Sequence, residues 1–184
     1  MLNTRHTFDL NKGYMPYGIN IQNNKAFNTW AGWILYNTEP FILIVEEGQL
    51  DDVARKLMRI GLDHVARYIT PDTIAHLGIA LEYQQLIDFE EMKAALDKPD
   101  TQILDVRNTN EFAEGHLPHA THLFVGTLVD NLHRIDPSKQ LYLHCQSGDR
   151  ATIAASLLAK NGIKEVNIYS PSINEWKIKG GKLV

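Results

Sequence analysis

The chain has 184 residues, of which 44% are hydrophobic and 22% charged, so it has enough apolar material for one large packed domain or two small ones. Its formal net charge of -4 excludes a general basic field, and we therefore expect no nucleic-acid partner. Its longest apolar runs, such as residues 41–45, are too short to span a bilayer, and its first residues lack a signal pattern, so we expect no membrane partner and a cytoplasmic location.

The first part of the chain predicts strands and helices in alternation. Residues 41–46 form an apolar run that ends in Glu46 and is typical of a buried strand. Farther along, Val53, Leu57 and Ile60 recur at the spacing of one helix face, which predicts an amphipathic helix with these side chains in the core. Residues 70–82 close this part and link it to the next.

The second part opens with a helix. Asp88 and Glu91 have the spacing of a capping box for a helix at residues 89–96. We then expect strands at 102–106, 141–145 and 166–169, and an amphipathic helix at 151–162 that ends at a glycine. Strands that alternate with helices pair in parallel, so the sequence predicts an α/β fold in which helices flank a parallel sheet.

The two parts of the chain are similar in sequence, at an offset of about 102 positions in the first matching segments. The matched residues are Arg5 and Arg107, Gly13 and Gly115, Pro16 and Pro118, Gly61 and Gly162, Val65 and Val166, and Tyr68 and Tyr169. We interpret the chain as two copies of one module, residues 1–75 and 83–184, joined by a linker at 76–82. The first copy has no counterpart of the helix at 89–96, so it is truncated, which leaves open whether the chain is a fragment of a longer protein.

The only cysteine, Cys145, lies at the end of the predicted strand 141–145. In parallel α/β sheets, ligands bind beyond the carboxyl ends of the strands, where helix N-termini point N–H groups outward. If the loop after Cys145 curls round the sulfur, its amides form a nest that binds anions and favours a thiolate. We assign the loop to Gln146, Ser147, Gly148, Asp149 and Arg150.

Single positions in this loop suit that interpretation. Gly148 tolerates the positive φ of a tight curve, and Arg150 supplies a cation that can pair with an oxyanion through two parallel hydrogen bonds. A carboxylate of Asp149 would weaken a positive pocket, so we expect it to point outward. The competing interpretation is a buried core cysteine, which the polar residues after Cys145 disfavour.

The second module resembles the rhodanese family of sulfurtransferases. The resemblance rests on ILDVR at 103–107, EFAEGHLPHA at 111–120, CQSGDR at 145–150, and Trp176 with Gly180. It implies a fold of two rhodanese-like modules, without a cofactor or metal, in which Cys145 takes sulfur from thiosulfate or a small persulfide and passes it to a thiol. It also implies that the amides of residues 146–150 cradle the persulfide and that Arg150 orients an anionic donor.

Loop length separates two activities within this resemblance. Relatives with phosphatase or arsenate reductase activity carry one more residue between the cysteine and the arginine, which makes a wider ring for a tetrahedral oxyanion. In this chain, residues 146–149 separate Cys145 from Arg150. The loop therefore favours sulfur transfer over phosphoryl transfer.

The first module looks like a degenerate copy. Glu46 stands opposite Cys145 and Gln49 opposite Arg150, so we expect this module to be inactive. Residues 1–75 also resemble the middle region of fusions in which a metallo-β-lactamase-fold persulfide dioxygenase precedes two such modules. This implies a dioxygenase domain as a partner, and the alternative function is a persulfide carrier or docking module for that domain.

Two further groups of residues need assignment. His116, His119 and His122 recur at every third position, but Pro118 interrupts any regular helix, so we expect a turn and no metal site. Asp105 and Arg107 are interpreted as a structural ion pair that steadies the fold.

Overall fold

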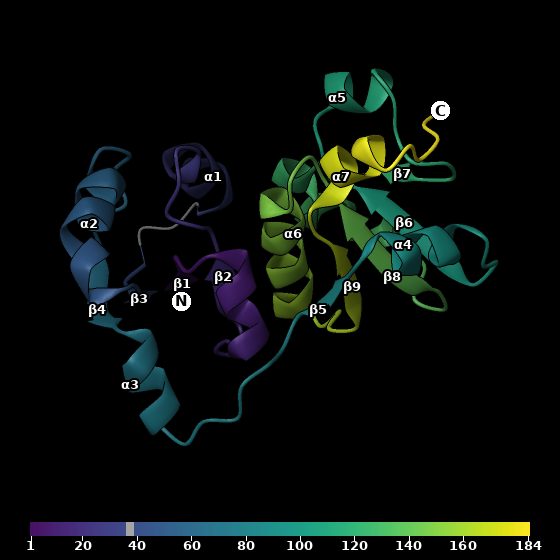
Figure 1. Cartoon of the computed structure of the whole chain (residues 1–184). Helices are drawn as coiled ribbons and strands as arrows, with labels where there is room; N and C mark the ends of the chain where they lie inside the picture. Colours follow the sequence, from purple (N-terminus) through teal and green to yellow (C-terminus); the bar gives the residue numbers. More distant parts are fainter. Residues whose placement is uncertain (36–38) are drawn as a thin grey trace. The chain divides into compact units, whose positions relative to one another are not determined.

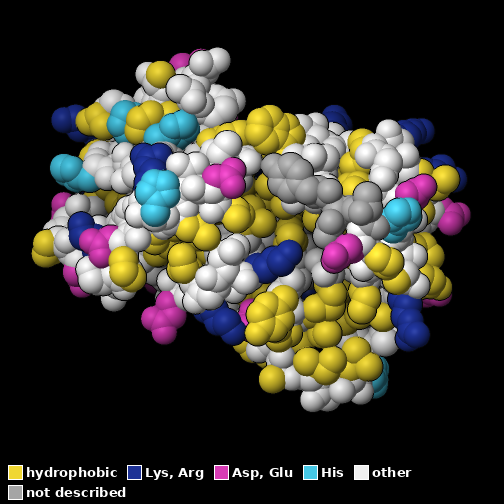
Figure 2. All heavy atoms as spheres, turned by 180° about the vertical axis from the view of Figure 1, so that it is seen from behind, with side chains coloured by type: hydrophobic (Ala, Val, Ile, Leu, Met, Phe, Trp, Pro, Cys, Tyr) yellow, Lys and Arg dark blue, Asp and Glu magenta, His cyan; other side chains and the backbone are white. Residues whose placement is uncertain are grey.

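The computed structural model describes residues 1–35 and 39–184. The chain divides into two compact units, Met1–Tyr83 and Gln84–Val184 (Figure 1). The end of the segment predicted as a linker is bonded to the first unit, because the N–H and carbonyl groups of Glu82 pair with those of Tyr14 at 2.9 Å. Among the described residues, no helix combines the length and apolar character that a membrane span requires. On the face shown in Figure 2, basic and acidic side chains are interspersed over the surface.

The first unit contains a parallel sheet with the order β2-β1-β3-β4. Its strands are β1 (Leu2–Asn3), β2 (Ile19–Asn20), β3 (Phe41–Ile44) and β4 (Val65–Ile69). Its α-helices are α1 (Phe27–Ile34), α2 (Leu50–Met58) and α3 (Pro71–His76), and its 3-10 helices are η1 (Thr7–Lys12) and η2 (Glu47–Gln49). Val53 and Leu57 of α2 are fully buried as the sequence predicts, whereas Ile60 is half-buried and lies beyond the end of the helix, so the predicted core face ends at Leu57.

The second unit contains a parallel sheet with the order β5-β9-β8-β6-β7. Its strands are β5 (Gln85–Ile87), β6 (Thr101–Asp105), β7 (Thr121–His122), β8 (Gln140–His144) and β9 (Val166–Tyr169). Its α-helices are α4 (Phe89–Leu96), α5 (Thr109–Ala113), α6 (Asp149–Lys160) and α7 (Ser172–Ile178), and its 3-10 helices are η3 (Val125–Thr127) and η4 (Val129–Arg134). These elements confirm the predicted α/β fold with helices beside parallel sheets.

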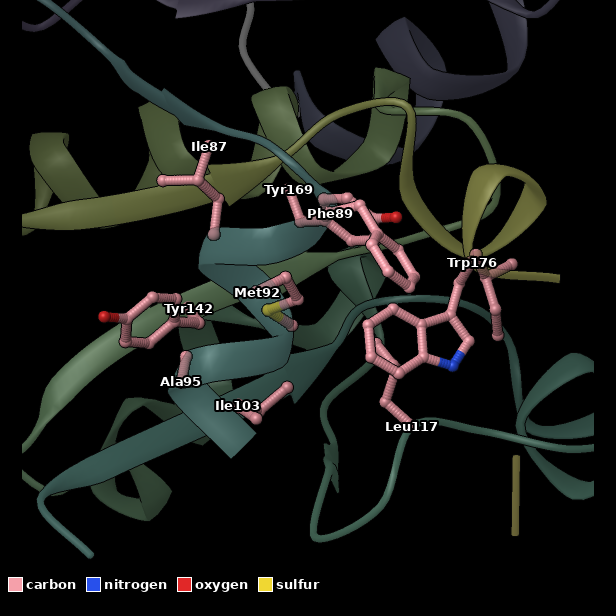
Figure 3. Close-up of a cluster of buried hydrophobic side chains, with 10 residues drawn as sticks. Ile87, Phe89, Met92, Ala95, Ile103, Leu117, Tyr142, Tyr169 and Trp176 are labelled. Carbon is pink, nitrogen blue, oxygen red and sulfur yellow. The ribbon is translucent and has the colours of Figure 1, made fainter. Parts of the chain in front are cut away.

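The core of the second unit lies on both faces of its sheet. Because side chains alternate along a strand, Ile103 and Tyr142 point toward α4, whereas Leu104 and Leu143 point to the face where α6 packs against β8 and β9. Figure 3 shows the cluster on the α4 side, where Trp176 of α7 approaches Leu117. Its members are Ile87, Phe89, Met92, Ala95, Ile103, Leu117, Tyr142, Tyr169, Ile173 and Trp176.

The helix starts of the second unit follow the sequence closely. Asp88 and Glu91 form the predicted capping box, in which the Asp88 carboxylate accepts from the Glu91 N–H and the Glu91 carboxylate accepts from the Asp88 N–H, both at 2.9 Å. This reciprocal pair satisfies two N–H groups that a helix start leaves without intrahelical partners. Helix α6 begins at Asp149, two residues before the predicted start at residue 151.

The two sheets share their strand order and much of their register. Leu2 lies opposite Ile19 and Leu43 in the first unit, as Leu104 lies opposite Thr121 and Leu143 in the second. Strand β4 therefore takes the position of β9, and the first sheet has no described counterpart of β5.

The register corrects two of the sequence matches. Asn3 pairs with Ile44 and Asp105 pairs with His144, so the residue in the position of Cys145 is Val45 and not Glu46. A register shift after Phe41 places Tyr68 opposite Leu43, whereas Ile168 lies opposite Leu143. Tyr68 is accordingly 52% exposed while Tyr169 is buried, because one extra residue in a strand reverses the direction of the side chains that follow.

Asp105 and Arg107 form the predicted structural ion pair. The two side chains are almost fully buried and their closest atoms, Arg107 Nη2 and Asp105 Oδ2, are 2.6 Å apart. Arg107 also donates to the carbonyl of Gly115 at 2.8 Å, which ties the end of β6 to the turn after α5.

The first unit keeps the arginine but not the carboxylate. Arg5 donates to the side chain of Asn3 at 3.2 Å and to the carbonyl of Gly13 at 3.0 Å. Burial lowers the pKa of Arg5, although the charges of Asp9 and Glu46 oppose that shift. In the first unit, the charges of Asp9 and Glu46 thus only partly counter the burial of the arginine, whereas in the second unit Asp105 pairs with it directly.

We expect Asp105→Asn to reduce the free energy of unfolding of the second unit by about 3 kcal/mol, because it leaves the buried charge of Arg107 uncompensated. Urea unfolding followed by Trp176 fluorescence measures this, in a background where Trp30 and Trp33 are changed to Phe. The control is Asp130→Asn, at an exposed position of the same unit. Equal effects of the two substitutions would contradict a stabilising role for the pair.

Candidate active site

The candidate site lies at the carboxyl ends of β6, β8 and β9. Cys145 follows directly after β8 and the residue is 1% exposed. The loop behind it is attached to α7, because the carbonyls of Cys145 and Gln146 accept hydrogen bonds from the N–H groups of Ile173 and Asn174 at 3.3 and 3.2 Å. These bonds fix the path of the chain between β8 and α6.

Gly148 brings its N–H group to the sulfur. This N–H donates to Cys145 Sγ at 3.1 Å, and Gly148 adopts a φ of +108°. A side chain at this position would clash with Ser170, whose Oγ lies too close to the place of a Cβ atom. Both the backbone conformation and the close approach of Ser170 therefore require glycine.

Helix α6 starts immediately after this turn. The carbonyl of Gly148 accepts from the Thr152 N–H at 3.0 Å and from the Thr152 hydroxyl at 3.1 Å. The sulfur thus lies at the N-terminal end of a helix of 12 residues, where the helix dipole favours negative charge.

The remaining predicted loop residues have different surroundings. Gln146 is half-buried and its side-chain amide donates to the Asn174 side chain at 2.5 Å. Ser147 is exposed, and Asp149 is half-buried in the first turn of α6. The structure thus brings Gly148 to the sulfur and Gln146 to α7.

Arg150 is paired with a carboxylate that the sequence analysis did not select. Its two terminal nitrogens donate to the two carboxylate oxygens of Glu111, at 2.5 and 2.6 Å. Glu111 belongs to a capping box with Asn108 at the start of α5, so its position is also fixed by main-chain contacts. The Asn108 to Glu111 spacing is a sequence signal for that box, but the sequence contains no signal for the contact with Arg150.

The electrostatics of the pair favour both charges. The hydrogen bonds from Arg150 lower the pKa of Glu111, against the effect of burial. Burial opposes the charge of Arg150, but the hydrogen bonds to Glu111 and the attraction of Cys145 outweigh it and raise the pKa of Arg150. The guanidinium and the carboxylate therefore stay ionised and form a neutral pair beside the loop.

Ser172 is a second residue that the sequence analysis missed. Its hydroxyl accepts from the Cys145 N–H at 3.0 Å, donates to the Tyr169 carbonyl at 2.6 Å and lies 4.0 Å from Cys145 Sγ. Ser172 has a φ of +69° and is fully buried. A serine in the left-handed region is uncommon, and the contacts to Cys145 and Tyr169 hold it there.

His144 is a fully buried histidine next to the ion pair. Its Nε2 atom lies 3.6 Å from the Asp105 carboxylate, and the described residues provide no hydrogen-bond partner for either ring nitrogen. Burial lowers the pKa of His144 to about 4, although the charge of Asp105 opposes that shift. His144 is therefore neutral near pH 7.

The three histidines of the predicted turn do not converge. The rings of His116 and His122 both stack on Phe112, and their nitrogens contact the carbonyls of Phe112 and Arg107 at 3.0 and 2.8 Å. Within residues 1–35 and 39–184, no group of three histidine, cysteine or acidic side chains is arranged to hold a metal ion. Aromatic packing and main-chain contacts account for His116 and His122.

Comparison with known proteins assigns the second unit to a family. The model of the rhodanese-like domain matches residues 88–179. The uncharacterized protein YqhL of Bacillus subtilis is 35% identical over 114 residues, which cover 60% of this chain and 86% of that protein. The chain therefore belongs to the rhodanese-like domain family.

Other relatives carry functional names. The putative sulfur carrier protein YrkF of Bacillus subtilis is 30% identical over 91 residues, and the chain spans only 49% of its length. The thiosulfate:glutathione sulfurtransferase of Saccharomyces cerevisiae is 26% identical over 112 residues, which cover 53% of this chain and 81% of that enzyme. The family thus includes distant relatives named as sulfurtransferases.

Solved structures agree with the fold. The Alr3790 protein of Anabaena is 26% identical with a TM-score of 0.50, over 53% of this chain and 81% of that one. A thiosulfate sulfurtransferase of Pseudomonas aeruginosa is 20% identical with a TM-score of 0.50. The match extends over 100% of this chain and 36% of the Pseudomonas chain. The second likeness concerns the fold alone.

We expect Gly148→Ala to slow any reaction of the Cys145 thiol by at least about tenfold, because a side chain there moves the amide away from the sulfur. The matched control is Gly162→Ala at the other end of α6, where φ is also positive, at +90°, but no atom lies within 4 Å of the added carbon. Alkylation of the thiol, timed by mass spectrometry, measures both variants. Equal rates would show that the Gly148 amide does not set the reactivity.

We also expect the second unit to lose stability between pH 7 and pH 4 because of His144. In this range the unfolded chain binds a proton at His144 and the folded chain does not. Lowering the pH from 7 to 4 should therefore reduce the free energy of unfolding by about 3 kcal/mol through this residue. His144→Leu should remove that part of the slope in urea unfolding, whereas His133→Gln, at an exposed position, should not. A His144→Leu variant with an unchanged slope would contradict a neutral buried imidazole.

Proposed function

We propose that the chain is a sulfurtransferase in which Cys145 carries sulfane sulfur as a persulfide. The observation that supports this most is the hydrogen bond from the Gly148 N–H to Cys145 Sγ at the start of α6. Such a position stabilises a thiolate before the reaction and a negatively charged persulfide after it.

In the first step, the Cys145 thiolate attacks the outer sulfur of the donor. With thiosulfate, the new S–S bond forms as the old one breaks, and sulfite leaves with the bonding electron pair. With a small persulfide, the leaving group is the corresponding thiolate, which takes up the proton that the outer sulfur carried. No oxidant or reductant is needed, because the sulfane sulfur only changes its partner.

In the second step, an acceptor thiolate attacks the outer sulfur of the Cys145 persulfide. The acceptor becomes a persulfide and Cys145 returns to the thiolate, which completes a double-displacement cycle. A thiol acceptor and a free catalytic cysteine both suit a reducing compartment, so we place the protein in the cytoplasm. The name of the yeast relative pairs thiosulfate with a thiol, glutathione, and supports this class of donor and acceptor.

The length of the loop supports sulfur transfer over phosphoryl transfer. Residues 146–149 separate Cys145 from Arg150, and the chain turns directly into α6 at Asp149. A tetrahedral phosphoryl group has three terminal oxygens to bind, whereas a persulfide has one terminal sulfur. A short loop matches the smaller group.

A persulfide carrier is the second candidate function. Cys145 is 1% exposed, which limits the approach of a bulky acceptor, and one relative is named a putative sulfur carrier protein. In this version, the chain receives sulfur and keeps it until a partner docks, such as a dioxygenase domain of the metallo-β-lactamase fold. The first unit, with Val45 in the position of Cys145, is an inactive copy of the module in both versions.

We expect Cys145→Ser to abolish sulfur transfer from thiosulfate or a small persulfide to a thiol, because a hydroxyl does not form the persulfide. Glu46→Gln, in the exposed residue after Val45, should leave the rate unchanged. Sulfite or persulfide formation with and without acceptor measures turnover. Full activity of Cys145→Ser would contradict the proposal, while a single turnover in the natural chain would favour the carrier.

A further inference from the structure

We infer that Glu111 determines which sulfur donors the site accepts, by occupying the donor groups of Arg150 and so favouring persulfides of low charge over dianions such as thiosulfate. This inference rests on the proposed sulfurtransferase function. It also changes the role of Arg150, which the family resemblance implies to be a binding group for an anionic donor.

The contact between the two side chains uses the groups that an anion would use. A guanidinium binds carboxylates and other oxyanions best through two parallel N–H bonds. In this chain both terminal nitrogens of Arg150 make such bonds with the carboxylate of Glu111, at 2.5 and 2.6 Å. A donor oxyanion that takes the same two bonds must displace this carboxylate.

The Glu111 carboxylate is also held in place by the main chain at the start of α5. It accepts from the Asn108 N–H at 3.2 Å, and the Glu111 N–H donates to the Asn108 side chain at 2.9 Å. Both side chains of the ion pair are largely buried, with 13% of Arg150 and 24% of Glu111 exposed. Displacement therefore breaks the start of α5 as well as the ion pair.

The charges around the loop also favour donors of low charge. Glu111 neutralises Arg150, Asp105 neutralises Arg107, and Asp149 adds a carboxylate in the first turn of α6. Because each guanidinium is paired with a carboxylate, neither contributes a net positive charge that would attract a dianion to Cys145. A persulfide with an uncharged side chain does not depend on such an attraction, because its outer sulfur needs only the position that the Gly148 amide defines.

The test compares donors that share one chemistry and differ in charge. The persulfide of 2-mercaptoethanol is uncharged in its side chain, whereas the persulfide of mercaptosuccinate carries two carboxylates, and both release a thiol. Thiosulfate is the third donor. The measured quantity is the rate at which the peptide containing Cys145 gains one sulfur, followed by mass spectrometry.

In the natural chain, we expect the uncharged persulfide to react at least about tenfold faster than the dicarboxylate persulfide. Glu111→Gln keeps an oxygen that can accept from the Asn108 N–H but removes the charge, so it should raise the rates with thiosulfate and the dicarboxylate, relative to the uncharged donor, by about tenfold. The matched control is Glu114→Gln, at an exposed glutamate after the same helix, which should leave the ratios unchanged.

Each outcome decides between the alternatives. If Glu111→Gln lowers the ratios or leaves them within about twofold of the natural chain, the inference is wrong. If that variant does not fold, as judged by circular dichroism, equal rates of the two persulfides in the natural chain overturn the inference instead. If no donor adds sulfur to Cys145 in the natural chain, the proposed function itself fails.

Discussion

The hydrogen bond between the Gly148 N–H and the Cys145 sulfur is the interaction on which the site depends. It fixes a thiol at the start of α6, and it exists because Gly148 adopts a φ of +108° against Ser170. Strand β8, in the middle of the sheet, brings the cysteine to the carboxyl ends of the strands, and the N-terminal end of α7 holds the loop through the carbonyls of Cys145 and Gln146. A change in any of these contacts moves the amide relative to the sulfur, so loop geometry and chemical reactivity are linked.

The two units share a framework of strands and turns but differ at the position of the thiol. In each, an arginine after the first strand of the shared pattern donates to a glycine carbonyl, Arg5 to Gly13 and Arg107 to Gly115. This contact ties a strand end to a turn and needs no catalytic residue. The second unit adds Asp105 and the thiol, whereas Val45 takes the position of the thiol in the first. The framework is therefore independent of the reactive group.

The sequence predicts the local features of this protein well and the contacts between distant segments less well. The capping box of Asp88 and Glu91, the ion pair of Asp105 and Arg107, and the order of α4, β6, β8, α6 and β9 all follow from spacing within a few residues, whereas β5, β7, α5 and α7 were not predicted. Glu111 and Ser172 reach the site from residues that lie 39 and 27 positions from their partners. Such contacts depend on how strand ends meet in space. The match of Glu46 with Cys145 is wrong because strand register sets equivalence, and the register selects Val45.

The central claim is that Cys145 holds a second sulfur at the start of α6. The most direct measurement is mass spectrometry of the natural chain after incubation with a small persulfide and removal of the excess. We expect one added sulfur on the peptide that contains Cys145, released as a new persulfide when a thiol is added. A chain that gains no sulfur on this peptide, although its thiol is reduced and the unit is folded, would contradict the account.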